Sequence, residues 1–149
     1  MKLTILNPHQ YPIPKRRKLD LICRLVDKEI GELKGIVNLV FCDDKTVHRL
    51  NRDYRQKDKV TDVLTFTYYR DSVETRRGAS LLGEVIISIP QTKRQAKEYE
   101  VTFEGELYKL VIHGLLHLRG YDHEKEEDYR VMKLLEEKIM KKLLTSSEI

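Results

Sequence analysis

Hydrophobic residues follow two patterns along the chain, short continuous runs and longer stretches with a spacing of three and four. The run from Lys2 to Asn7 predicts a strand. Residues 14 to 32 predict an amphipathic helix with Leu19, Ile22, Cys23, Val26 and Ile30 on its apolar face. The β-branched run over residues 36–41 predicts a second strand, and residues 45–52 predict a short helix after it.

The middle of the chain is more polar and is broken into shorter elements. Residues 53–59 predict a surface loop, and residues 61–67 predict a strand. The charged residues 70–78 predict a hairpin-like excursion before another strand over residues 82–87. Ser88, followed three positions later by Gln91 and with Pro90 between them, indicates the start of a helix that ends near Tyr99.

The last third of the chain predicts two helices. The first runs from Thr102 to about Arg119 and stops at Gly120, and the second covers residues 124–144, acidic at its start and basic at its end. We therefore expect an α+β fold with residues 1–149 in a single domain. Its core would be a mixed sheet of about four strands packed with about five helices.

Composition supports a soluble, globular chain. With 149 residues, of which 40% are apolar and 35% charged, the chain has the size and balance of one folded domain. It lacks an apolar run of the roughly 18 residues that a membrane helix needs, and its N-terminus does not match a signal peptide. We therefore expect a cytoplasmic protein with no membrane partner. Cys23 and Cys42 suit neither a disulfide framework nor a cysteine zinc site and are expected to be buried.

The charge is basic overall but unevenly distributed. The net charge is +4, and residues 1–100 carry 20 Lys and Arg against 14 Asp and Glu, whereas residues 101–149 carry 8 against 10. Such an excess suits a polyanionic partner such as a nucleic acid, although many surfaces carry it for solubility alone. Charge alone therefore does not distinguish a nucleic-acid partner from a surface that is basic only for solubility.

Three of the five histidines lie within eleven residues, at His113, His117 and His123. Positions four apart stack on one face of a helix, so His113 and His117 direct two imidazoles towards one point. Gly120 allows the backbone to leave the helix and to turn His123 back towards the same point. Histidines at this spacing often form only a polar stripe, but apolar neighbours would leave these imidazoles buried and in need of a partner.

Three imidazoles with an open fourth position are typical of a catalytic zinc site, whereas structural zinc sites usually close with four ligands. We therefore expect one Zn²⁺ per chain, held at the end of this helix. Imidazole ligands also suit nickel, copper or iron.

The same spacing of histidines and glycine occurs in metzincin peptidases. Those enzymes place a glutamate directly after the first histidine as general base, and here that position is Gly114. Glu106 lies seven residues before His113, two helical turns away and too far to serve the same water. Peptide hydrolysis by the usual route is therefore disfavoured.

Arg55 lies in the predicted loop before the strand over residues 61–67. A solvated arginine would be the ordinary interpretation of such a position. Beside a three-histidine metal site, however, a guanidinium is what phosphodiester chemistry needs, because its planar fork binds two phosphate oxygens. Arg55 is therefore a candidate catalytic residue.

Four segments together resemble the YbeY family of bacterial rRNA-maturation endoribonucleases. They are residues 51–55 with Asp58, residues 61–66, residues 82–85 and, as the family's hallmark, residues 113–124. Met132 and Glu136 on the following helix also fit. Val60, Thr65 and Glu84 depart from the usual Pro, Ser and Asp of the family, which puts in doubt any role that needs a shorter carboxylate at position 84.

The resemblance implies a metal-dependent endoribonuclease that cuts single-stranded RNA in 16S rRNA 3′-end maturation and ribosome quality control. It implies zinc on His113, His117 and His123, and a functional role for Arg55. The expected partners are single-stranded RNA, an rRNA precursor and the ribosome or its small subunit, with no DNA.

The attacking group stays open, because either a metal-activated water or the RNA 2′-OH could attack phosphorus. Glu84 and Asp122 are conceivable proton carriers, although a strand carboxylate and a helix-start cap are the simpler interpretations. The competing functions are an rRNA-binding or ribosome-binding module that zinc merely stabilises and, less favoured, a metallopeptidase.

Overall fold

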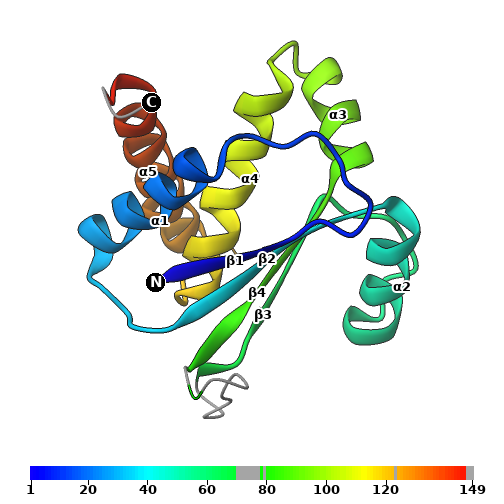
Figure 1. Ribbon diagram of the computed structural model, residues 1–149, viewed down its shortest axis with the longest axis horizontal. Coiled ribbons are helices and arrows are strands. Elements are labelled where there is room, and N and C mark those ends of the chain that lie inside the picture. The colour runs from blue at the N-terminus through cyan, green and yellow to red at the C-terminus, as the bar shows by residue number, and fades with distance from the viewer. Residues whose placement is uncertain (70–77, 79, 123, 147–149) are drawn as a thin grey trace.

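The computed structural model describes residues 1–69, 78, 80–122 and 124–146, in which five helices surround one sheet of four strands (Figure 1). The strands are β1 (Lys2–Leu6), β2 (Ile36–Cys42), β3 (Val63–Thr67) and β4 (Leu81–Ser88). The helices are α1 (Arg16–Ile30), α2 (Asp44–Arg55), α3 (Ile89–Glu98), α4 (Phe103–Leu118) and α5 (Glu126–Thr145). The predicted α+β class and the mixed sheet with its numbers of strands and helices are confirmed over these residues.

The sheet has the strand order β1-β2-β4-β3. β1, β2 and β4 run parallel to one another, and β3 pairs antiparallel with β4 in a register that places Thr65 opposite Val85. This antiparallel pair is what the predicted hairpin-like connection requires, although residues 70–77 of that connection lie outside the described residues. β3 is therefore an edge strand of the described sheet.

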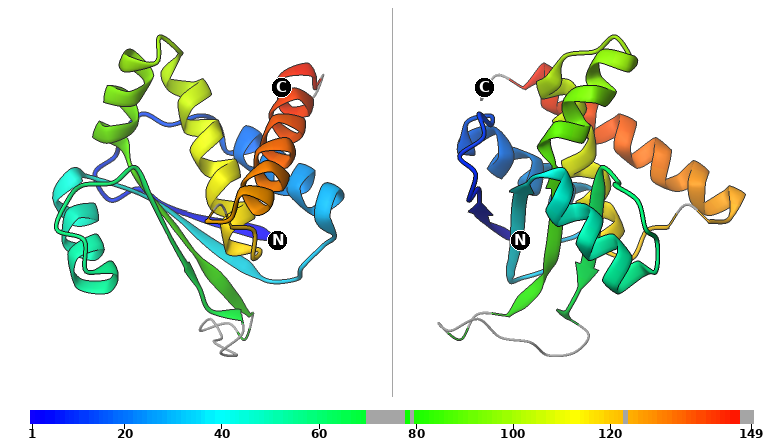
Figure 2. Two further views of the ribbon diagram at one scale, coloured as in Figure 1. Left: turned by 180° about the vertical axis from the view of Figure 1, so that it is seen from behind. Right: turned by 90° about the vertical axis from the view of Figure 1, so that its right-hand side faces the viewer.

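Helices cover the two faces of the sheet unequally (Figure 2). α1 and α4 pack on one face, where the main hydrophobic core includes Val37, Leu39, Val85 and Ile87, and α5 packs against these two helices. α2 lies on the other face, over a smaller cluster of Cys42, Val47, Leu64 and Ile86 with Phe66 packed against it. Because side chains alternate along a strand, the odd-numbered residues of β3 and those of β4 from Gly83 onward face α4, and the even-numbered ones face α2. Leu82 is the exception: it lies at a register shift between β2 and β4 and belongs to the main core.

Two glycines let α4 lie close to the sheet. A Cβ atom at Gly114 of α4 would lie 2.5 Å from Val85 Cγ1, and a Cβ at Gly83 of β4 would lie 2.3 Å from the backbone oxygen of Phe66 and 2.7 Å from Leu118 Cδ1. Neither position has room for a side chain. The packing of α4 against β4 therefore requires a glycine at position 114, and a glutamate there would collide with β4.

Replacing Gly83 with alanine tests this close approach. Because the obstructing atom belongs to the backbone of β3, we expect Gly83→Ala to lower the free energy of unfolding by about 3 kcal/mol, at the upper end of the usual cost of overpacking. Denaturant unfolding measures the change, with Thr67→Ala as the control, since Thr67 is exposed directly opposite Gly83. A Gly83→Ala protein that unfolds at the wild-type midpoint would contradict the close packing.

Helix boundaries agree with the sequence except at the end of α2. Residues 53–55, predicted as part of a surface loop, form the last turn of this helix. Gln56 ends it in the left-handed conformation with φ of 54°, and the side chain of Asn51 donates a 3.0 Å hydrogen bond to the backbone oxygen of Lys59. The prediction was wrong because the stop residue is a glutamine rather than a glycine. Arg55 is therefore the last residue of a helix and not part of a loop.

Other local predictions are confirmed. Ser88 caps α3 by accepting a hydrogen bond from the backbone N–H of Gln91 at 3.1 Å, and Gly120 after α4 has a φ of 101°. Cys23 and Cys42 are buried free thiols, and burial raises the pKa of each to about 12, so neither is a reactive thiolate. Across the described residues, each helix is too short or too polar to traverse a bilayer.

Candidate functional site

α4 presents two histidines from an otherwise buried helix. It starts at Thr102, whose hydroxyl accepts a 3.0 Å hydrogen bond from the backbone N–H of Gly105. Ten of its residues are buried, yet His113 and His117 remain partly exposed one turn apart. Their ring centroids are 6.2 Å apart and the rings are nearly perpendicular, at 74°. The predicted placement of these two imidazoles on one face is confirmed.

Glu136 of α5 holds His113 from the other side. Its Oε1 lies 2.5 Å from Nδ1 of His113, and both side chains are only 22–28% exposed. An ionised carboxylate only accepts hydrogen bonds, so in the neutral ring Nδ1 carries the proton and Nε2 keeps its lone pair. This contact spans 23 residues of sequence and fixes both the tautomer and the orientation of the ring.

The donor set matches what a divalent transition metal needs. Two imidazoles share a face, and His113 has Nδ1 engaged with a carboxylate, an arrangement that leaves Nε2 as a metal ligand. His123 lies outside the described residues, and among the described ones no group of three His, Cys, Asp or Glu is arranged around a metal position. The convergence of three histidines therefore stays a prediction that the described pair fits.

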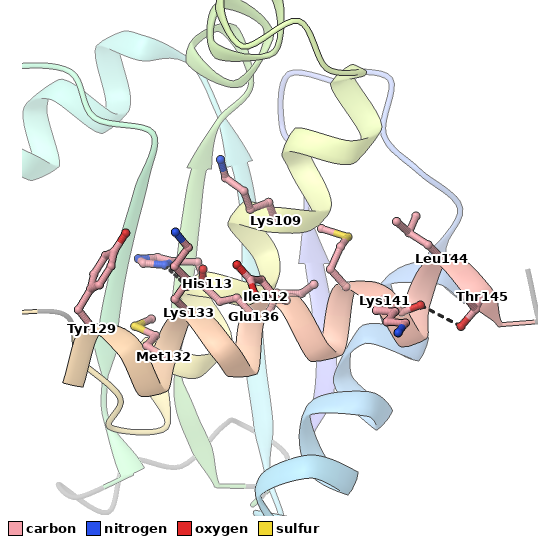
Figure 3. A pocket seen from close by; sticks show the side chains of 12 residues that line it. Lys109, Ile112, His113, Tyr129, Met132, Lys133, Glu136, Lys141, Leu144 and Thr145 are labelled. Carbon is pink, nitrogen blue, oxygen red and sulfur yellow. Dashed lines mark hydrogen bonds and ion pairs between the residues drawn. The ribbon is translucent and has the colours of Figure 1, made fainter. Parts of the chain in front are cut away.

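A groove of about 750 Å³ opens beside His113 between α4 and α5 (Figure 3). Ile112, Met132 and Met140 give it an apolar lining, while Lys109 and Lys133 also line it. Figure 3 shows His113 and Glu136 meeting within it, with Tyr129 and Lys133 near them and Leu144 and Thr145 towards the other end. No pattern in the sequence predicts this groove, because it forms between two helices that pack together only in the folded chain.

Arg55 lies across the outer edge of β3. Its guanidinium donates a hydrogen bond to the backbone oxygen of Thr65 and stands over the ring of Phe66, 5.2 Å from the ring centroid. Ser88 donates its backbone N–H to Asp62, and Tyr68 donates to Leu82, so the even-numbered residues of β3 pair with β4. The backbone groups of Thr65 consequently point away from the sheet, where Arg55 reaches them.

Thr65 links Arg55 to the histidine helix. Its hydroxyl lies 3.5 Å from the backbone oxygen of Gly114, which follows His113 in α4. Thr65 thus contacts α4 through its side chain and Arg55 through its backbone. Arg55 and the helix that carries His113 and His117 therefore both contact Thr65 of the edge strand. In the sequence, Thr65 stands out only as a departure from the family pattern.

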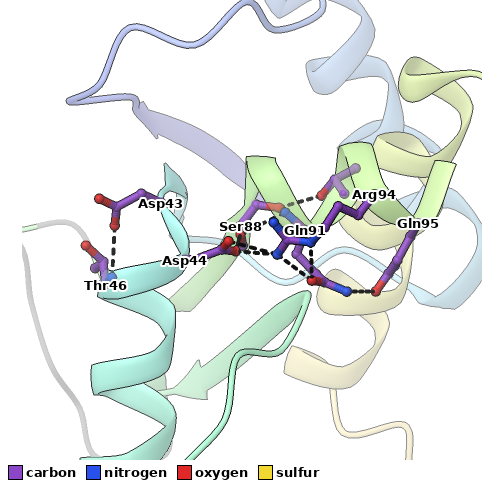
Figure 4. A network of polar contacts seen from close by, with 8 residues as sticks. Asp43, Asp44, Thr46, Ser88, Gln91, Arg94 and Gln95 are labelled. Atoms are coloured by element: carbon purple, nitrogen blue, oxygen red, sulfur yellow. Dashed lines mark hydrogen bonds and ion pairs between the residues drawn. The ribbon is translucent and has the colours of Figure 1, made fainter. Parts of the chain in front are cut away.

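A network of polar side chains joins α2 to α3 at the carboxyl end of β4 (Figure 4). Asp44 accepts hydrogen bonds from Ser88 Oγ at 2.8 Å and from Arg94 Nη2 at 2.9 Å. Gln95 of the same helix donates from its side chain to Asp62 at 3.2 Å and to Glu106 at 2.9 Å. These contacts anchor the residue that leads into β3.

Glu106 belongs to this packing and not to the histidine site. It is 2% exposed, contacts Gln95 and lies 3.2 Å from Lys109 Nζ. Seven residues of helix, about 10 Å, separate it from His113. The expectation that it is too far to act as a base there agrees with this placement.

The two conceivable proton carriers have other surroundings. Glu84, an even-numbered residue of β4, faces α2 and lies beside Tyr68, whose pKa is raised to about 12 by burial and by the negative charge of Glu84. It is therefore separated from His113 by the sheet itself. Asp122 accepts a 3.3 Å hydrogen bond from the backbone N–H of Glu124 in the turn before α5. Glu84 is thus a strand carboxylate, as the simpler interpretation has it. The expectation that Asp122 caps the following helix was wrong, because the N-cap of α5 is Lys125 and none of the described side chains caps that helix.

Comparison with known proteins identifies relatives along most of the chain. A family model described as Endoribonuclease YbeY matches residues 9–144. The chain is 45% identical over 109 residues to Endoribonuclease YbeY of Desulforamulus reducens, covering 72% of this chain and 71% of the relative. It is 40% identical over 127 residues to the protein of the same description from Carboxydothermus hydrogenoformans, covering 84% and 85%.

Two further relatives differ in length or in sequence. Endoribonuclease YbeY of Myxococcus xanthus is 46% identical over 110 residues, but the match spans only 37% of that longer protein. A solution structure of a Thermotoga maritima protein superposes with a TM-score of 0.59 at 28% identity, covering 98% of this chain and 94% of the other. The solved structure therefore shares the fold of this chain over nearly its whole length.

Proposed function

Because the chain belongs to the YbeY family of endoribonucleases, hydrolases that act on RNA, we propose that it is a metal-dependent endoribonuclease specific for single strands. Its cellular task would be 16S rRNA 3′-end maturation and ribosome quality control in the cytoplasm. The partners would be an rRNA precursor and the small ribosomal subunit. The excess of basic residues in the first 100 positions suits a polyanionic substrate of this kind.

The feature that supports this proposal most directly is the junction at Thr65. Its hydroxyl lies next to the backbone of Gly114 in the histidine helix, and its backbone oxygen accepts a hydrogen bond from Arg55. A helix that carries imidazoles suited to a metal ion and a guanidinium suited to a phosphate thereby both contact the same edge strand. A metal ion and a guanidinium together suit phosphodiester cleavage, whereas a purely structural zinc site has no need of the arginine.

His113, His117 and His123 would hold one Zn²⁺. When bound, the metal would supply Lewis acidity towards a phosphate oxygen and lower the pKa of a water molecule. The chain's own contribution is orientation: Glu136 accepts the Nδ1 proton of His113 and so directs Nε2 to the ligand position. His117, one turn later on the same face, presents its ring to the same side.

Arg55 would bind the scissile phosphate. Its fork can donate two parallel hydrogen bonds to phosphate oxygens and balance negative charge that grows as the bond breaks. The hydrogen bond to Thr65 and the contact with Phe66 fix the guanidinium in advance. A prearranged donor of this kind acts without a reorganisation cost at the moment of reaction.

One experiment separates the enzyme from a zinc-stabilised RNA-binding module. Protein purified without added metal is assayed for metal content and, on the same samples, for cleavage of single-stranded and duplex RNA. We expect one metal per chain and cleavage of the single strand alone. RNA binding without cleavage would instead favour the module, and cleavage of an unstructured protein would revive the peptidase.

The ends of the RNA products identify the attacking group. A 2′,3′-cyclic phosphate forms when the neighbouring 2′-OH attacks phosphorus, whereas hydrolysis by water leaves a linear phosphate. Mass spectrometry of the products distinguishes the two. Detection of the cyclic end would exclude direct attack by water.

Removing the carboxylate behind His113 tests the role of Glu136. We expect Glu136→Ala to lower metal affinity by about 10- to 100-fold, the usual effect of losing a residue that orients a metal ligand. Glu136→Gln should lose less metal affinity, because the amide oxygen still accepts a hydrogen bond from the Nδ1–H of His113. Competition with a chromogenic chelator measures the affinity, with Glu137→Ala, the exposed neighbour on α5, as the control. Equal affinities of the Glu136→Ala and Glu137→Ala proteins would contradict this role.

A further inference from the structure

Tyr54 forms an exposed aromatic surface on the α2 side of the sheet. It lies in the last turn of α2 and is 64% exposed, one of the most exposed large hydrophobic side chains described. Its ring meets the ring of Phe66 edge-to-face, with centroids 5.7 Å apart and an interplanar angle of 77°. Phe66 in turn packs against the small core of Leu64 and Ile86. Tyr54 is therefore exposed but supported from beneath.

The aromatic pair shares its support with Arg55. The guanidinium lies 5.2 Å from the centroid of the same Phe66 ring that Tyr54 touches, and Arg55 is the next residue in the chain. If Arg55 holds a phosphate, the base of the adjoining nucleotide could therefore reach the ring of Tyr54. An aromatic side chain beside a hydrophobic cluster is commonly buried in that cluster, yet most of the surface of Tyr54 remains in solvent.

Positive charge continues past this surface. Lys57 and Lys59 follow Arg55 in the connection to β3, and both are exposed. The nearby acidic residues Asp53 and Asp58 are already paired, with Arg52 at 3.0 Å and His48 at 2.6 Å. An exposed aromatic ring flanked by cationic side chains is the combination by which proteins bind single-stranded nucleic acids, because rings stack on bases while lysine and arginine contact phosphates.

We propose that Tyr54 forms a base-stacking subsite for single-stranded RNA, holding the base of a nucleotide next to the phosphate that Arg55 binds. This inference rests on the proposed endoribonuclease function and adds a second contact surface on the far side of β3 from the histidines. The RNA strand would pass over the edge of the sheet at Arg55. The base stacked on Tyr54 would lie on the α2 side of that edge. Paired bases cannot present a free face to this ring, so the subsite favours single strands.

Fluorescence tests the contact directly, because the chain has no tryptophan. In Tyr54→Trp the new indole is the sole tryptophan, and stacking of a base quenches its emission. The holoenzyme is titrated with a single-stranded oligoadenylate and with the same strand in a duplex, and the RNA is checked for cleavage on each sample. Tyr99→Trp is the matched control, since Tyr99 at the end of α3 is 53% exposed. We expect quenching of Trp at position 54 by the single strand alone.

Substitution gives the second measurement. Loss of one stacked base weakens binding by about 5- to 150-fold, so Tyr54→Ala should raise Kd and KM by about tenfold while kcat changes little. Tyr54→Phe keeps the ring and should bind as the wild type does. Circular dichroism confirms that each variant is folded.

The outcomes separate this inference from the function on which it rests. If the wild type cleaves single-stranded RNA but Tyr54→Ala binds it equally well, the subsite is refuted and the function stands. Equal responses of the two tryptophan variants likewise refute it. If the wild type neither binds nor cleaves single-stranded RNA, both proposals fall.

Discussion

We expect His113→Ala and His117→Ala each to lower the cleavage of single-stranded RNA by at least about a hundredfold and to abolish metal binding. Loss of a group that merely orients a ligand costs 10- to 100-fold, so loss of a ligand itself costs at least as much. The two rings lie on one face of α4, so we expect both of them to be needed for the same ion. Metal content by elemental analysis and RNA cleavage are measured on the same preparations, with His123→Ala beside them.

A matched control is His9→Ala. His9 is a histidine with its side chain 44% exposed, 3.7 Å from Asp43, and it belongs to none of the elements around the site. We expect this variant to keep one metal per chain and the wild-type cleavage rate. Metal retained by His117→Ala, or cleavage that survives loss of the metal, would contradict the proposed centre and favour the RNA-binding module.

We expect Arg55→Ala to lower kcat for RNA cleavage by about 100- to 1,000-fold while the metal content stays at one per chain. The magnitude is that of removing a prearranged donor to developing negative charge. Arg55→Lys restores the charge but not the planar fork, so it should recover only part of the loss. Steady-state kinetics with a single-stranded substrate measure kcat and KM separately.

Arg52→Ala is the control for Arg55. Arg52 lies on the same helix, is similarly exposed and is paired with Asp53 at 3.0 Å. Its removal changes the surface charge equally but should leave kcat unchanged. Equal losses of kcat in the two variants would show that position 55 contributes only general charge, and Arg55 would no longer be a catalytic residue.

Most of the fold follows from local patterns in the sequence. The apolar spacing in α1 and α4, the β-branched runs of β2 and β4 and the cap at Ser88 each predict their own element, because each reflects the conformation of neighbouring residues. The end of α2 was mispredicted because it does not follow from such a local pattern. Gln56 takes the left-handed conformation that glycine usually provides, and the fixing contact from Asn51 to Lys59 joins residues eight apart.

The candidate site is predictable only where its residues are neighbours in sequence. His113 and His117 are one helical turn apart, so their shared face follows from the helix period alone. The contacts of Glu136 with His113 and of Thr65 with Gly114 span 23 and 49 residues and arise only when α5 and β3 pack against α4. Strand alternation could have excluded Glu84 earlier, because Val85 next to it faces the main core.

The hydrogen bond from Arg55 to Thr65 also bears on whether two molecules of this protein can pair through the edge strand β3. An edge strand presents outward backbone groups to which a strand of a second molecule can add, a common route to aggregation. The guanidinium occupies the central outward acceptor of β3 and places a fixed positive charge there, so an approaching strand meets both a filled position and a charge to desolvate. The residue proposed to hold RNA thereby also protects the edge of the sheet from pairing with a second molecule.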